Sequence, residues 1–377
     1  METIAKSTSP AALTYQDYFV NMGPQHPSTH GVLRLIVKLA GETVLGVTPH
    51  IGYVHRGIEK MAEAQTVIQF THLTSRLDYL SAHINNWCWA MTVEKALGLE
   101  VPERAEYIRI IMAELTRIAS HQLWWGVFGM DLGAFTPFLY AFRDREKIND
   151  IFEKNCGARL TMNYICPGGV MEDVEPDFEQ DVRTFCEYFK PVIEEYDKLL
   201  TGNIIIQERT KGVGVLTPEV AKAYGVTGPT LRASGVDYDV RKNHPYGFYP
   251  RIDFKTAVAT EGDSWARYLV RLEEMRQSIK IIEQALDQMP KSGPVRGKVP
   301  AVLRVPPGRY LARAEAARGE IAFFLVGDGK PLPYRVKIRS PNFSNLAAFP
   351  KVIKGWRVAD LVAAMSTFDL VIPDIDR

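Results

Sequence analysis

The chain has 377 residues, 46% of them hydrophobic and 24% charged, so it can bury a large core and does not have the composition of a disordered protein. Its 45 Lys and Arg and 44 Asp and Glu residues give a net charge of +1, without the basic excess expected of a nucleic-acid binder. No apolar stretch approaches the roughly 20 residues of a membrane helix, and residues 1–10 lack the pattern of a secretory signal. We therefore expect a cytoplasmic protein, or one on the equivalent side of an organelle membrane, that meets a membrane only through partners.

Motifs for self-contained cofactor binding are missing from the sequence. The four cysteines do not form any C-x-x-C motif, which argues against a zinc ribbon, a thioredoxin motif or an iron–sulfur cluster held by this chain alone. Gly212 and Gly214 lack the third glycine of a dinucleotide-binding fingerprint. We expect no metal and no cofactor bound by this chain.

The first half of the chain predicts a β segment followed by long helices. Within residues 18–56, the β-branched run at 32–37 can pair with 42–47 across a turn. Residues 58–97 contain neither Gly nor Pro and predict one long helix or two in line. A second helix is predicted from Pro102 to about Trp125, then a break over 126–137 and a helix over 138–155.

The second half predicts further helices and a β module. Helices are expected over 178–200, 264–289 and 358–365, and strands over 321–326 and 334–338. The predicted fold is mainly α with small β modules. The expected divisions are a flexible extension (1–17), an N-terminal β module (18–56), a helical core (57–297), a second β module (298–340) and a C-terminal segment that returns to the core (341–377).

Three segments carry residues suited to chemistry. In the loop 23–31, His26 and His30 are flanked by prolines and glycines, and they could be proton donors, metal ligands or plain turn residues. His72, Arg76, Tyr79 and His83 are spaced 4, 3 and 4 apart, which places them on one face of the predicted helix, lining a cavity or facing solvent.

The third segment contains Asp131 in a strongly apolar context. A carboxylate there is expected to be partly buried and to need a partner, for which a histidine is suited. The alternative is that Asp131 caps the following helix.

Five ordered blocks together resemble one protein family. They are Gly-Pro-Gln-His-Pro-Ser-Thr-His-Gly at 23–31, His-Arg-Gly-Ile-Glu-Lys at 55–60, Arg-Leu-Asp-Tyr at 76–79, Glu-Glu-Met-Arg-Gln-Ser at 273–278 and Asp-Ile-Asp-Arg at 374–377. They resemble the D subunit of the proton-pumping NADH–quinone oxidoreductase, respiratory complex I, known in mitochondria as the 49-kDa subunit. The resemblance covers the chain from about residue 18 to its end.

The resemblance implies a helical core like that of the nickel–iron hydrogenase large subunit, with the metal site lost. The two metal-binding motifs of that enzyme fall on residues 76–81 and 369–377, where Asp78 and Ser81 replace the cysteines of the first. Soft metals prefer thiolates, so a working hydrogenase is disfavoured.

In the resembling family, the vacated cavity holds the quinone headgroup. By that resemblance His30 and Tyr79 bind the quinone carbonyls, Asp131 pairs with His30, and His26 lies close by. Arg56 and Arg76 are implied to lie near an iron–sulfur cluster of the neighbouring small subunit.

The implied activity is proton-coupled, two-electron reduction of quinone with electrons from that cluster. The implied partners are the B component of the complex, which is the small iron–sulfur subunit, the C component, and the H component, which forms the quinone channel in the membrane. Two alternatives stay open from the sequence: the same role in a complex driven by ferredoxin or another donor, and a purely structural subunit.

Overall fold

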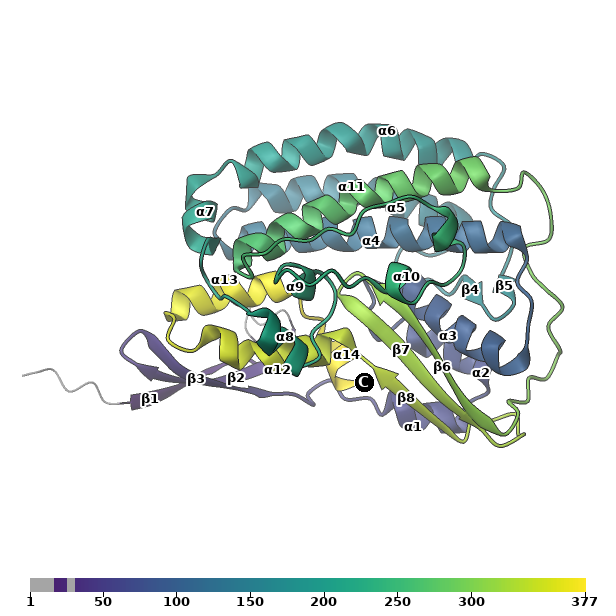
Figure 1. Ribbon diagram of the computed structural model, residues 1–377, viewed down its shortest axis with the longest axis horizontal. Helices are drawn as coiled ribbons and strands as arrows, with labels where there is room; N and C mark the ends of the chain where they lie inside the picture. Colours follow the sequence, from purple (N-terminus) through teal and green to yellow (C-terminus); the bar gives the residue numbers. More distant parts are fainter. Residues whose placement is uncertain (1–16, 26–30) are drawn as a thin grey trace, which may run out of the picture.

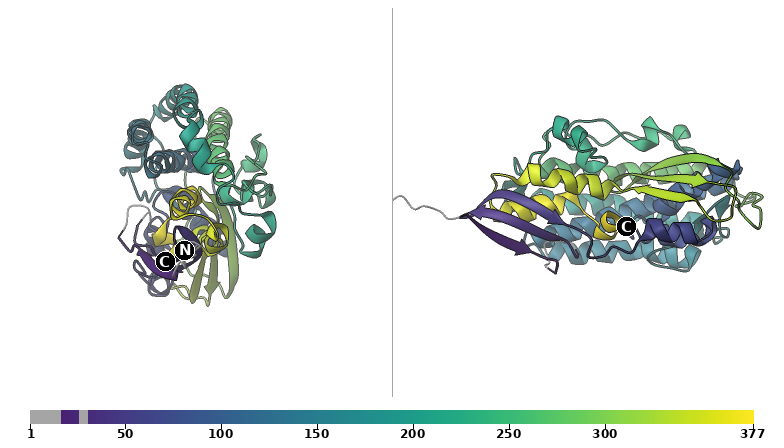
Figure 2. Two further views of the ribbon diagram at one scale, coloured as in Figure 1. Left: turned by 90° about the vertical axis from the view of Figure 1, so that its left-hand side faces the viewer. Right: turned by 90° about the horizontal axis from the view of Figure 1, so that it is seen from below.

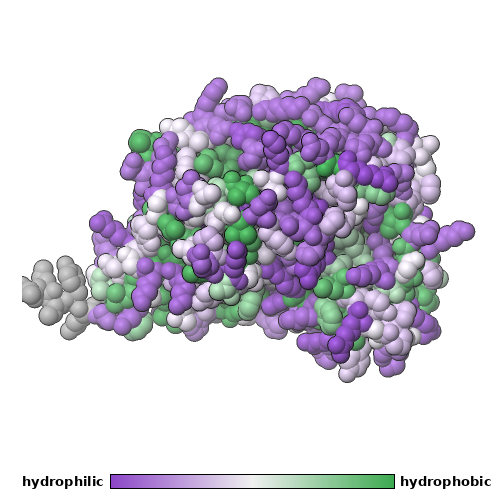
Figure 3. Space-filling view, in the orientation of Figure 1, coloured by the Kyte–Doolittle hydropathy of each residue, from purple (hydrophilic) through white to green (hydrophobic). Residues whose placement is uncertain are grey.

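The computed structural model describes residues 17–25 and 31–377, which form a layer of long helices over two small sheets (Figure 1). The long helices are α4 (Glu103–Asp131), α5 (Thr136–Cys156), α6 (Phe178–Tyr196) and α11 (Ser264–Gln288). They pack against one another, with α4 touching both α5 and α11. Polar residues cover the outer side of α6 (Figure 3), while four tryptophans are fully buried in the interior: Trp87, Trp89, Trp124 and Trp125.

Shorter helices connect and flank this layer. They are α1 (Ile58–Met61), α2 (Val67–Thr74), α3 (Ala82–Leu97), α7 (Ile204–Thr210), α8 (Pro218–Ala223), α9 (Pro229–Arg232), α10 (Val240–Asn243), α12 (Pro341–Ile353), α13 (Val358–Phe368) and α14 (Ile372–Asp376). In the part of the chain that the structure describes, we find no helix both long and apolar enough to cross a lipid bilayer.

Two three-stranded antiparallel sheets lie on the other side of the molecule (Figure 2). The first consists of β1 (Asp17–Met22), β2 (Arg34–Ala40) and β3 (Thr43–His50), and its buried residues share one apolar core with α12, α13 and α14. The second consists of β6 (Gly308–Ala316), β7 (Gly319–Gly327) and β8 (Arg335–Arg339), and it packs on α3. A two-residue hairpin joins β4 (Ile165–Cys166) to β5 (Gly169–Val170). The prediction of a mainly α fold with small β modules is confirmed.

The predicted break at 126–137 is placed too early, because α4 continues through two glycines to Asp131. A Cβ atom on Gly126 would lie 3.0 Å from the Cβ of Ala141 and 3.0 Å from the Cα of Phe138. A Cβ on Gly129 would lie 3.1 Å from the Cβ of Pro137. The glycines therefore do not end the helix. They let α5 approach α4 more closely than any side chain would allow.

The prediction of one long helix or two in line over 58–97 is also wrong, because the region forms three separate helices, α1, α2 and α3, and the chain turns between α2 and α3. Residues 75–81 form turns rather than helix, and the Oδ1 atom of Asp78 accepts a hydrogen bond from the backbone N–H of Leu80 at 3.1 Å. Such local aspartate bonds compete with helical hydrogen bonds. His72, Arg76, Tyr79 and His83 consequently do not share one helix face.

Candidate functional site

The turn at 75–81 brings Tyr79 to the mouth of a cavity of about 200 Å³. The walls come from four separate parts of the chain: Tyr79 and Leu80 from the turn, Leu123, Trp124 and Val127 from α4, Arg318 from the β6–β7 turn, and residues 369–371. Tyr79 is 37% exposed, whereas Asp78 beside it is 2% exposed. The cavity therefore has an apolar wall, a phenol at its opening and charged groups at its inner end.

Arg318 is the central charge of this inner end. It lies in the two-residue turn between β6 and β7 and is 1% exposed. Its Nη1 lies 3.2 Å from Oδ2 of Asp78 and donates to Oγ of Ser120 at 2.7 Å, and its Nη2 donates to Oδ1 of Asp369 at 2.8 Å. One guanidinium thus joins the turn at 75–81, helix α4 and the residue that follows α13.

These charges act on the Tyr79 phenol. Burial raises the pKa of Tyr79 above its ordinary value, Arg318 lowers it, and Asp78 and Asp369 raise it again. For Arg318, burial by itself would lower the pKa, but Asp369 and Asp78 raise it above its ordinary value. At neutral pH the cavity therefore combines a neutral phenol with a permanent buried cation.

A third buried carboxylate lies near the same turn. Asp374 on α14 accepts hydrogen bonds from Ser340 and from Asn342, the latter at 2.7 Å. Burial, followed by the charge of Asp78, raises the pKa of Asp374 to about 6. This carboxyl group titrates close to physiological pH, which the sequence alone did not indicate.

The histidine loop itself lies outside the described residues, so His26 and His30 are not placed. The residue after it, Gly31, lies against α14, since a Cβ there would be 3.4 Å from Cγ1 of Ile372. Asp131 is the last residue of α4 and is partly exposed. It follows Val127, a residue of the cavity wall, by four positions, so the two lie on the same side of the helix.

Arg56 and Arg76, predicted from separate sequence blocks, lie together in the structure. The Nη2 of Arg56 donates to the backbone carbonyl of Arg76 at 2.8 Å. Burial lowers the pKa of Arg56, the charge of Arg76 lowers it further, and the more distant charge of Asp376 offsets part of this decrease. Among residues 17–25 and 31–377, neither guanidinium has a carboxylate within ion-pair distance. Two adjacent, partly exposed cations are therefore available to an anionic neighbour.

The C-terminal motif block (374–377) packs against the start of the motif block at 55–60. Asp376 accepts hydrogen bonds from the backbone N–H groups of Gly52 at 2.8 Å and Val54 at 2.9 Å. Its own carbonyl lies 2.6 Å from Nδ1 of His55. Blocks more than 300 residues apart in sequence are thus packed together next to Arg56.

Sequence reasoning missed Arg318, the central charge at the inner end of the cavity. Arg318 occupies a two-residue hairpin turn, a position that is normally exposed, and nothing in its local sequence indicates burial. Arg271 and Glu274 on α11 are fully buried behind the cavity wall. Glu274 was part of a recognised block, but its role depends on contacts with distant segments.

Comparison with known proteins gives consistent matches. A model of the family described as "Respiratory-chain NADH dehydrogenase, 49 Kd subunit" matches residues 131–304 and 297–377. A protein of Clostridium beijerinckii, named as the D subunit of NADH-quinone oxidoreductase, is 49% identical over 362 residues, which cover 96% of this chain and 98% of the relative. A protein of Opitutus terrae, named as a D 2 subunit of the same enzyme, is 48% identical, covering 100% of this chain and 95% of its own. A protein of Bacteroides thetaiotaomicron, named as a C/D subunit, is 51% identical, covering 96% of this chain and 68% of its own.

Proposed function

Because the chain belongs to the family of the 49-kDa subunit of respiratory-chain NADH dehydrogenase, named as the D subunit of NADH-quinone oxidoreductase in bacterial relatives, we propose that its Tyr79 cavity is the quinone headgroup site. The observation that carries this proposal is the cavity itself, with a phenol at its mouth and Arg318 fixed at its inner end. An aromatic headgroup fits the apolar wall of Leu123, Trp124 and Val127. A quinone carbonyl can accept a hydrogen bond from the Tyr79 hydroxyl.

The charges of the cavity suit proton-coupled reduction. A phenol with a raised pKa is a poor proton donor to a neutral quinone, but an adequate one to the strongly basic two-electron-reduced headgroup. Arg318 favours negative charge that develops beside it, while Asp78 and Asp369 hold the guanidinium in place and offset part of that effect. Proton transfer from Tyr79 then follows reduction.

The histidine loop completes the proposed site. His30, which precedes Gly31 at the surface of α14, is proposed to bind the second quinone carbonyl, with His26 nearby. Asp131, one helical turn beyond Val127, is proposed to pair with His30 and to raise its pKa. Release of the His30 proton to the reduced quinone would leave Asp131 without its counter-charge.

Electrons are proposed to arrive from an iron–sulfur cluster held by the small B component of the complex, with no cofactor bound by this chain. The adjacent guanidiniums of Arg56 and Arg76 support this location, since an anionic cluster would neutralise the two charges that face outward together. The relative named as a C/D subunit supports the C component as a neighbour. We propose the H component as the membrane contact, with this chain peripheral on the cytoplasmic or equivalent side.

The test is quinone reductase activity in membranes that carry Tyr79→Phe. The control is NADH oxidation with a hydrophilic artificial acceptor in the same membranes, which reports assembly and upstream electron transfer. The proposal predicts that quinone reduction falls about tenfold or more, a barrier change near 1.4 kcal/mol, while acceptor activity holds. Unchanged quinone reduction would refute the assignment of Tyr79 and favour a structural role.

A further inference from the structure

A row of buried ionisable groups leads from the cavity into the helical layer. Asp369, at the inner end of the cavity, has its Oδ2 3.9 Å from Nε of Arg271 on α11. The Arg271 guanidinium lies over the ring of Trp124, 4.5 Å from its centre. One helical turn along α11, Oε2 of Glu274 lies 2.8 Å from Nε2 of His121 on α4. The cavity wall and Arg271 are thus in contact, and the charge of Arg271 acts on both Glu274 and His121.

Several polar atoms along this row lack a hydrogen-bond partner within the described part of the chain. They are Nδ1 of His121, Nε and Nη2 of Arg271, Oγ of Ser366 and Oδ2 of Asp369. Ser366 lies next to the cavity wall, because its backbone carbonyl accepts from the indole N–H of Trp124 at 2.8 Å and from the backbone N–H of Asp369 at 3.3 Å. Buried polar atoms of this kind are usually satisfied by internal water. The atoms therefore mark positions suited to water between the cavity and His121.

The surroundings of His121 determine the protonation state of its imidazole. Burial lowers its pKa most, Glu274 on α11 raises it, and Arg271 on α11 and Arg117 on α4 lower it, with a net decrease. The imidazole is therefore neutral at neutral pH. Arg232 is the main group that holds the pKa of Glu274 well below its ordinary value despite burial. The ionised Glu274 accepts a hydrogen bond from the Nε2–H of His121. The lone pair of Nδ1 remains available to accept another proton.

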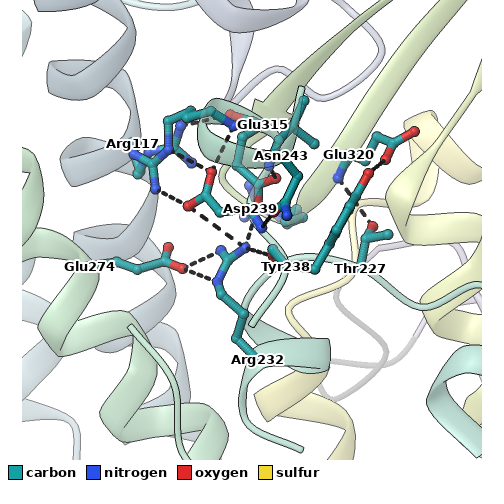
Figure 4. Close-up of polar contacts among 12 residues, drawn as sticks. Arg117, Thr227, Arg232, Tyr238, Asp239, Asn243, Glu274, Glu315 and Glu320 are labelled. Carbon is teal, nitrogen blue, oxygen red and sulfur yellow. Dashed lines mark hydrogen bonds and ion pairs between the residues drawn. The ribbon is translucent and has the colours of Figure 1, made fainter. Parts of the chain in front are cut away.

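Beyond Glu274 the row continues to the opposite surface. Figure 4 shows Arg232 lying between Glu274 and Glu315, with its Nη1 2.7 Å from Oε1 of Glu315. The backbone carbonyl of Tyr238 accepts from the same Nη1 at 2.9 Å, and the Tyr238 hydroxyl donates to Glu320 at 2.5 Å. Tyr238 is partly exposed. Polar groups thus extend from Glu274 to the surface at Tyr238, and the charge of Arg232 keeps Glu274 ionised.

We propose that the His121–Glu274 pair returns a proton to Tyr79 after quinone reduction, through internal water held between His121, Arg271 and Asp369. The inference rests on the proposed function of the cavity. When Tyr79 has given its proton to the reduced headgroup, the phenolate charge favours protonation of His121 at Nδ1 by a solvent proton that arrives through the internal water, since Nε2 already carries a proton. The resulting imidazolium releases the proton from Nδ1, which restores the phenol and the neutral imidazole. One solvent proton replaces the proton delivered to the headgroup, and no oxidant or reductant takes part.

In this scheme His121 is a positioning and proton-holding residue, since it does not touch the quinone. Glu274 keeps the imidazole in one tautomer and stabilises the imidazolium. Arg271 and Asp369 orient the water. Substitutions of His121 should therefore slow proton return without changing electron entry into the complex.

The test uses His121→Gln in membranes that contain the whole complex. Glutamine can donate to Glu274 and offer an oxygen near the position of Nδ1, but it cannot hold a proton. We expect quinone reduction to fall about tenfold, the solvent deuterium isotope effect to increase, and the loss to become greater at alkaline pH. NADH oxidation with the hydrophilic acceptor should be unchanged.

A matched control is His83→Gln. His83 is also fully buried, but its Nδ1 faces the hydroxyl of Thr116 and its Nε2 faces the thiol of Cys156. Quinone reduction, isotope effect and pH profile should all keep their original values in this variant. Glu274→Gln is the second test variant, to be measured if His121→Gln does not assemble, and it should show the same increase in isotope effect.

Tyr79→Phe, measured in parallel, separates the two proposals. If Tyr79→Phe loses quinone reduction but assembled His121→Gln or Glu274→Gln keeps its rate and isotope effect, the proton-return proposal is wrong and the headgroup site stands. A loss of rate in these variants with an unchanged isotope effect and pH profile would show a merely structural role and also overturns it. If Tyr79→Phe itself keeps full activity, the headgroup site is wrong.

Discussion

Replacing Arg318 by Met should destabilise the protein strongly, because the guanidinium is buried between two carboxylates. It lies 3.2 Å from Asp78 and 2.8 Å from Asp369 and also donates to Ser120. Removing one partner of a buried ion pair typically costs about 3–5 kcal/mol, since the remaining charge stays in a poorly solvated place. Here two carboxylates lose their cation at once, so we expect a loss at the upper end of this range.

The assay is thermal inactivation of quinone reduction by the solubilised complex, with native electrophoresis to measure assembly. Arg318→Met should assemble poorly and lose activity at a clearly lower temperature. A triple variant that adds Asp78→Asn and Asp369→Asn removes both stranded carboxylates but takes the Asp369 carboxylate from Arg271, so it should recover part of the lost thermal stability. If Arg318→Met assembles fully and loses activity at the original temperature, the ion-pair reasoning is refuted.

Three further predictions follow from the same region. Burial and Asp78 raise the pKa of Asp374 to about 6, so the folded state binds the proton more tightly than the unfolded state and stability falls as pH rises from about 4 to about 6. Asp374→Asn should therefore raise the free energy of unfolding at pH 8 by up to about 3 kcal/mol, with no increase at pH 4. Equal effects of the substitution at both pH values would contradict this. Val127→Phe should narrow the cavity and raise the KM for quinone several-fold with unchanged artificial-acceptor activity. An unchanged KM would place the quinone elsewhere. Arg56→Gln should shift the partner's iron–sulfur cluster to a lower midpoint potential in an EPR titration, because a nearby positive charge favours the reduced cluster. An unchanged midpoint potential would show that Arg56 does not lie near the cluster.

Local patterns predicted the elements well where local forces decide them. The helix expected at 264–289 is α11 at Ser264–Gln288, and the strand expected at 321–326 lies within β7 at Gly319–Gly327. In α11 a capping Asp263 and a gap-free run of helix formers agree with the packing. In β7 a continuous apolar run over residues 321–326 agrees with its place as the central strand between β6 and β8.

Prediction failed where contacts with a distant segment determine the backbone conformation around a residue. Gly126 is a helix breaker in isolation, but in α4 it permits contact with α5. Asp78 is compatible with a helix, but it forms a local turn because Arg318 holds its carboxylate from 240 residues away. The five motif blocks identified the family and singled out Tyr79 as a candidate, because those positions are recognisable in sequence. Arg318, Arg271 and His121 gain their roles only from tertiary contacts, which no local pattern indicates.

The most direct measurement is a structure of the assembled complex with a bound quinone analogue. The account predicts the headgroup in the cavity between Tyr79 and α4, with one carbonyl oxygen about 3 Å from the Tyr79 hydroxyl and the ring against Trp124 and Val127. A headgroup bound elsewhere, with this cavity filled by side chains of a partner, would contradict it.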